Sequence, residues 1–143
     1  MKRKSLIATV SVISLVLLNT PANSAPPVSF TKVTVYKKWD ALIALNVTGK
    51  NNTSRNVRLS GSFYAKTKSG NIYGFPDFET LMLYDAYQNP CSGDSVDGNW
   101  TPKSVWTSTW CFAVPKGQTI TSVFLAANKY STPLTSIKVN IKN

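Results

Sequence analysis

The sequence predicts an all-β protein, an immunoglobulin-like antiparallel β-sandwich of about seven to eight strands. Three observations predict it: apolar and polar residues alternate along several segments, short turn motifs separate those segments, and no long stretch shows a convincing helical period. A chain of 143 residues suffices for one domain and is short for two. A small β-barrel is the competing architecture.

Alternation with period two defines the expected strands, because successive side chains of a strand point to opposite faces. The segments that show it are 33–35, 41–48, 57–66, 106–114, 120–127 and 137–142. In the second of them we expect Ile43, Leu45 and Val47 to face the core, and Leu42 and Ala44 to take the other face. In 57–66 the odd-numbered residues, Phe63 among them, share one face and Lys66 lies on the other, and in 137–142 we expect Ile137, Val139 and Ile141 inward and Lys138 outward. Residues 78–87 fit either a helix, with Phe78, Leu81, Met82 and Asp85 on one face, or a strand, with Leu81 and Leu83 on one face.

The N-terminal residues 1–24 have the layout of a secretory signal peptide. A basic start at Lys2–Lys4 precedes the apolar stretch Leu6–Leu18, which is too short for a permanent membrane anchor. Small residues at 22–24 place the expected cut before Ala25, which leaves 25–143 as a single domain. A buried N-terminal helix is the alternative interpretation.

Export changes how the two cysteines are interpreted. Cys91 and Cys111 are the only cysteines, and an oxidising destination favours a disulfide between them. Free thiols are the alternative. A catalytic thiol would need a neighbouring base, and the chain has no histidine to supply one.

Charge indicates a class of partner. The formal net charge is +10, and without the basic residues 2–4 it is about +7, so the exported chain is expected to be attracted to anionic surfaces. Solubility is the competing explanation of this charge. The candidate binding residues are Lys37, Lys38, Trp39, Arg55, Arg58 and Trp100.

The four tryptophans fall into two groups. Trp106 and Trp110 lie on the same face of the expected strand as Phe112, because all three are separated by even numbers of residues. We therefore expect both tryptophans in the core. Trp39 and Trp100 lie at element edges, where exposed indole rings could stack on sugar rings beside the lysines.

Acidic residues gather in one aromatic segment, 71–100, which contains no basic residue. We expect part of it to be a long connection, linked through Cys91 to the strand that carries Cys111. Long loops are often functional, but opposite charges within one chain also tend to pair. Either the segment binds a partner or it lies across the basic strands of its own domain.

The composition argues against an enzyme. Asp77 with Glu79, and Asp94 with Asp97, form only local carboxylate pairs, without the opposed geometry that glycoside hydrolysis requires. The stretch 94–98 lacks the ligand series of a calcium loop. We therefore expect no catalytic residue, no metal and no cofactor.

The stretch 110–117, with its Phe-x-Val-Pro-x-Gly core, precedes a strand and a closing alternating strand. Upstream, 44–52 runs from a strand into an Asn-rich turn, and 63–70 ends in a Ser-Gly turn. This order resembles the telokin-like, immunoglobulin-type domains secreted by Gram-positive bacteria and mycobacteria. The resemblance implies the sandwich fold and an extracellular location, and it carries no site residues.

The function expected from these observations is non-catalytic binding of an anionic cell-wall or matrix polymer by a secreted protein at the bacterial cell surface. No specific nucleic-acid partner is expected. The alternatives are a secreted cationic antimicrobial or membrane-active effector, and an inhibitor of an extracellular enzyme.

Overall fold

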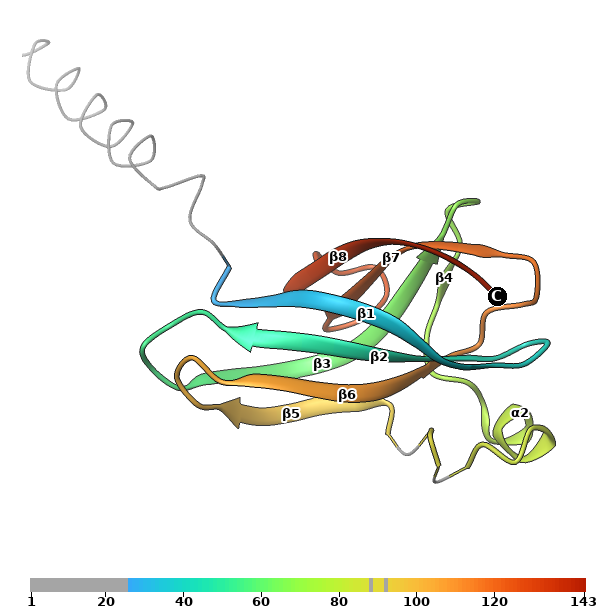
Figure 1. Cartoon of the computed structure of the whole chain (residues 1–143), viewed down its shortest axis with the longest axis horizontal. Helices are drawn as coiled ribbons and strands as arrows, with labels where there is room; N and C mark the ends of the chain where they lie inside the picture. The colour runs from blue at the N-terminus through green and yellow to red at the C-terminus, as the bar shows by residue number, and fades with distance from the viewer. Residues whose placement is uncertain (1–25, 88, 92) are drawn as a thin grey trace, which may run out of the picture.

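The computed structural model describes residues 26–143 apart from 88 and 92, so the expected signal peptide lies outside the described residues. Two antiparallel sheets face each other, which confirms the predicted all-β sandwich (Figure 1). One sheet has the order β1 (Val28–Lys38), β2 (Ile43–Asn51) and β6 (Val105–Phe112). The other has the order β4 (Ile72–Tyr73), β3 (Val57–Thr67), β7 (Thr119–Ala126) and β8 (Thr135–Lys142), with β5 (Ser95–Trp100) also paired to β3.

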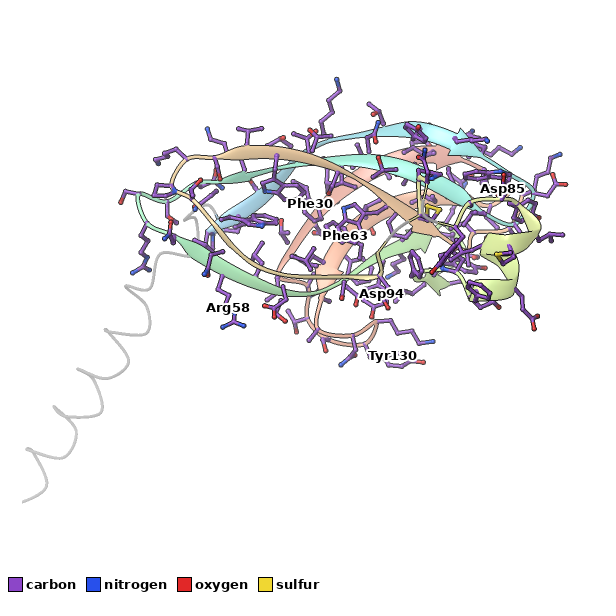
Figure 2. All side chains as sticks on the ribbon, turned by 90° about the horizontal axis from the view of Figure 1, so that it is seen from below. Phe30, Arg58, Phe63, Asp85, Asp94 and Tyr130 are labelled. Carbon is purple, nitrogen blue, oxygen red and sulfur yellow. A yellow bond between two sulfur atoms is a disulfide. The ribbon has the colours of Figure 1, made fainter. Side chains whose placement is uncertain are left out.

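Aromatic rings join the two sheets across the core. Phe63 of β3 lies between Phe30 of β1 and Trp110 of β6, with ring centroids 5.4 Å and 4.0 Å away. Figure 2 shows Phe30 and Phe63 inside the sandwich. Trp106 and Trp110 pack against this core, as their parity predicts. The inward residues predicted for 57–66 and 137–142 also lie there, namely Leu59, Phe63, Ala65, Ile137, Val139 and Ile141.

Part of the acidic segment 71–100 is the long connection that the sequence predicted, running from Tyr73 to Ser95 with Cys91 bonded to Cys111, but its two ends are strands. The segment contains β4, the short helix α2 (Phe78–Leu83) and β5. Strand β5 pairs with β3 from Val57–Trp100 to Ser62–Ser95. The prediction missed β5 because its sequence holds Asp97 and Gly98, residues that are depleted in strands.

The start of strand β2 and Leu42 just before it are buried on both faces. Ile43, Leu45 and Val47 lie in the main core as predicted. Leu42 and Ala44, assigned to the opposite face, are also fully buried. They pack in a second cluster with Leu81, Ala86, Cys91 and Cys111. The acidic segment therefore lies on its own domain, and apolar contacts hold it there.

The predicted disulfide forms and anchors this second cluster. Cys91 and Cys111 are bonded, with Cα atoms 5.5 Å apart, and both are buried. The bond ties the chain after α2 to the end of β6. The alternative of free thiols is therefore wrong.

Helix α2 resolves the ambiguity of residues 78–87. Asp77 caps its N-terminus by accepting a hydrogen bond from the Thr80 backbone N–H at 2.7 Å. Hydrogen bonds from the Thr80 side chain and backbone lower the pKa of Asp77. Leu81 is buried, whereas Phe78 and Met82 are exposed, so the helical face suggested by the sequence is not the face that packs.

Gly49 supplies the first testable prediction. A Cβ atom at this buried position would lie 2.0 Å from the Trp106 ring, so Gly49→Ala must displace the indole. We expect a loss of about 1 to 3 kcal/mol in the free energy of unfolding, measured by urea denaturation. Gly98→Ala in β5 is the matched control, because its Cβ would meet no atom within 4 Å. Equal effects of the two substitutions would contradict this packing.

The disulfide supplies the second prediction. It closes a loop with a sequence separation of 20, which is worth about 3 kcal/mol in the chain-entropy model. The double variant Cys91→Ser/Cys111→Ser should lose about that much stability in the same urea assay. Wild-type protein treated with dithiothreitol is the control and should show the same loss. Unfolding curves that do not differ from oxidised wild type would refute the anchoring role.

Candidate functional site

A row of polar side chains crosses the outer face of the five-stranded sheet. Lys66 of β3 pairs in register with Ser122 of β7, and Ser122 pairs with Lys138 of β8. Neighbouring strands lie about 4.8 Å apart, so the two lysine backbones are about 10 Å apart across the serine. Ala65 and Val123 are buried in the core, which directs Lys66 and Ser122 outward.

Two hollows adjoin this row. The first, of about 300 Å³, is lined by Lys66, Ile72, Ser122, Phe124, Lys129, Ser131, Pro133 and Ser136. The second, of about 390 Å³, is lined by Gly70, Asn71, Ile72, Tyr73, Lys129 and Tyr130. Ile72 and Lys129 line both hollows, so the two hollows adjoin each other. We call the two hollows, with the adjacent Lys138, the lysine groove.

The lysine groove combines positive charge with hydroxyl groups. None of the described residues that line it is acidic. Tyr130 is 84% exposed, and its ring centroid lies 5.0 Å from Lys129 Nζ (Figure 2). Phe124 is only 5% exposed and provides an apolar floor. Ammonium groups, hydroxyl donors and an aromatic ring are suited to an anionic chain of alcohol or sugar units.

Three of the candidate residues proposed from the sequence lie near the β1–β2 turn. Lys37 Nζ is 4.9 Å from the Trp39 ring centroid, in a cation–π contact. Lys38 Nζ donates a hydrogen bond to the Lys142 carbonyl oxygen. Trp39 is half-buried and packs against the second cluster. Both ammonium groups therefore already have contacts within the domain.

The other three candidates lie around the start of β3 and the end of β5. Arg58 forms an ion pair with Asp97 at 3.2 Å, and both side chains are largely exposed. Arg55 is exposed in the connection between β2 and β3. Trp100 is half-buried, with its ring 4.0 Å from Trp106, so it is less accessible than the sequence indicated.

The structure therefore separates the six candidate residues into two groups. The turn that carries Lys37 and Trp39 lies at the α2 end of the sandwich, and the β2–β3 connection that carries Arg55 lies at the other end (Figure 1). Figure 2 shows the same separation between Arg58 and Asp85, which follows α2. The lysine groove was missed because the sequence does not reveal which strands are neighbours.

Negative charge is concentrated around α2. Asp77, Glu79 and Asp85 are exposed there beside the exposed side chains of Phe78 and Met82. The segment 71–100 supplies no basic residue to balance them. The β1–β2 turn, with Lys37 and Lys38 beside it, lies at the same end of the sandwich, so positive charge there partly offsets these carboxylates.

The carboxylates have local roles. Asp77 caps α2, and Asp97 forms an ion pair with Arg58. Residues 94–98, which lack the ligand series of a calcium loop, lead into strand β5. Within residues 26–143, as far as they are described, no three His, Cys, Asp or Glu side chains are grouped so that they could hold a metal ion. Over the same part of the chain, no helix is long and apolar enough to cross a membrane.

Comparison with known proteins finds no family model that matches the chain and no match among curated proteins. The telokin-like resemblance and the immunoglobulin type of the sandwich therefore stay predictions.

Proposed function

We propose that this chain is an exported, non-catalytic binding protein that acts at the bacterial cell surface or in the extracellular matrix, and that it holds an anionic cell-wall or matrix polymer in the lysine groove. The observation that carries the proposal is the groove itself: Lys66 and Lys129 line it, Lys138 pairs in register with the lining residue Ser122, and none of the described lining residues is a carboxylate. The proposal of export rests on the signal-peptide-like layout of residues 1–24. The Cys91–Cys111 disulfide supports an oxidising location.

A polymer suits this site better than a small ion does. Several residues that line the two hollows are exposed, among them Lys66, Lys129 and Tyr130, so the hollows are open to solvent. Consecutive charged units of one chain can each meet a lysine, and such contacts add when they are linked. Teichoic acids have this form, with phosphate groups joined by polyols.

The third prediction tests the site by substitution. Lys66→Gln/Lys138→Gln should weaken binding of purified wall teichoic acid about tenfold in isothermal titration, because two ammonium groups leave the groove. Both lysines are exposed, so the fold should be retained. The matched control, Lys37→Gln/Arg55→Gln, removes the same charge elsewhere and should bind within about twofold of wild type.

Each other outcome has a definite meaning. Equal weakening in both double variants would show that net charge alone attracts the polymer, which contradicts the groove. A larger loss in the control would place the polymer on the residues first proposed from the sequence. Absence of binding by wild-type protein at physiological salt would reject the proposed function.

The fourth prediction concerns salt. Binding of a polyanion by lysines releases counterions, so the logarithm of the affinity should fall linearly as the logarithm of the NaCl concentration rises. The slope should be shallower by about 1 to 2 in Lys66→Gln/Lys138→Gln. Titrations at 50 to 300 mM NaCl measure both slopes, and an affinity insensitive to salt would contradict an electrostatic site.

A further inference from the structure

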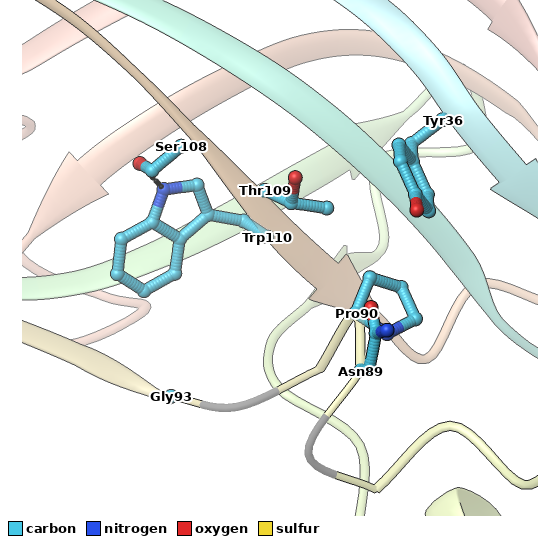
Figure 3. Close-up of a pocket in the computed structure, with 7 residues that line it drawn as sticks. All are labelled: Tyr36, Asn89, Pro90, Gly93, Ser108, Thr109 and Trp110. Carbon is cyan, nitrogen blue, oxygen red and sulfur yellow. Dashed lines mark hydrogen bonds between the residues drawn. The ribbon is translucent and has the colours of Figure 1, made fainter.

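A separate cavity of about 370 Å³ lies at the edge of β6, on the other sheet from the lysine groove (Figure 3). Tyr36 of β1 and Pro90 stand on one side of it, and Ser108 and Trp110 of β6 on the other. Thr109 lies between them. This volume is within the range of small-molecule sites, about 300 to 1,000 Å³. We call this cavity the neutral pocket.

The β6 wall of the neutral pocket is fixed by contacts within the domain. The Trp110 ring is stacked on Phe63, and its indole N–H donates a hydrogen bond to Ser108 Oγ at 2.6 Å. Thr109 Oγ1 donates to Asn46 Oδ1 at 2.6 Å. A ligand would therefore meet a wall that is already in place, and less conformational entropy is lost on binding.

The opposite wall offers groups that the fold leaves available. Tyr36 is 53% exposed, and Asn89 is exposed as well. Among the residues that the structure describes, neither the Tyr36 hydroxyl nor the Asn89 amide has a hydrogen-bond partner. Together with the Ser108 and Thr109 oxygens, they surround the cavity with donors and acceptors.

No charged side chain lines the neutral pocket, as far as its lining residues are described. Lys37 follows Tyr36 in sequence, but its ammonium group lies over Trp39. The pocket therefore has nothing to neutralise a phosphate or carboxylate. Its aromatic, proline and hydroxyl surfaces match a ligand with both an apolar face and several hydroxyl groups.

We propose that the neutral pocket binds an uncharged pyranose unit of a glycan, either a hexose or an N-acetylhexosamine. The C–H face of the sugar packs on Tyr36 and Pro90, and its hydroxyl or acetamido groups pair with Asn89 and Thr109. This site is independent of the lysine groove and does not rest on the proposed function. A protein with both sites can hold a neutral glycan and an anionic polymer at the same time.

The test uses two soluble, uncharged probes, triacetylchitotriose and cellotriose, each titrated into the full mature chain and followed by backbone amide NMR. We expect at least one probe to shift amides of residues 36, 89 and 108–110. Tyr36→Ala and Asn89→Ala should each weaken that binding about tenfold, because each removes a contact and neither residue is buried.

Two controls separate this site from the lysine groove. Tyr130→Ala removes an exposed tyrosine elsewhere, and Lys66→Gln/Lys138→Gln removes the groove lysines; both should bind the trisaccharide like wild type. Failure of both probes to shift the pocket amides overturns the proposal. So does binding that is unchanged in Tyr36→Ala and Asn89→Ala, provided that thermal melts show both variants folded. Neither result bears on teichoic acid binding.

Discussion

The structure depends on the burial of Phe63 between Phe30 and Trp110. Phe63 belongs to one sheet and the two flanking rings belong to the other, so this stack holds the two layers together. Aromatic rings bury large apolar areas in a core, and paired rings also favour particular mutual orientations. Because side chains alternate along a strand, placing Phe63 inward also directs Lys66 of the same strand outward.

Both candidate sites follow from that constraint. On the outer face of the five-stranded sheet, the register brings Lys66 and Lys138 to either side of Ser122. At the edge of the other sheet, Trp110 stacks on Phe63 and also lines the neutral pocket. The core thus sets the positions of surface groups that are far apart in the sequence. The acidic segment contributes to both sites, with Ile72 and Tyr73 in the lysine groove and Asn89 and Pro90 in the neutral pocket.

Strand parity could be predicted from the sequence, and it correctly placed Phe63 inward and both Lys66 and Lys138 outward. The neighbours of each strand could not be predicted, because pairing depends on packing between distant segments; hence the groove was missed. The burial of Leu42 was also hidden, since alternation cannot show that a second layer covers the outer face. Arg58 was predicted as a binding residue, but sequence alone could not reveal its ion pair with Asp97.

The most direct test of the groove is a map of the polymer on the folded protein. Backbone amide NMR spectra of residues 25–143, recorded during titration with purified teichoic acid at physiological salt, provide that map. We predict that the largest shift changes fall on residues 66, 122 and 138, on three adjoining strands of one sheet, and on residue 129 in the connection between β7 and β8. Shift changes confined to 37–39 and 55–58, or spread evenly over every exposed lysine, would contradict a groove built by the pairing of β3, β7 and β8.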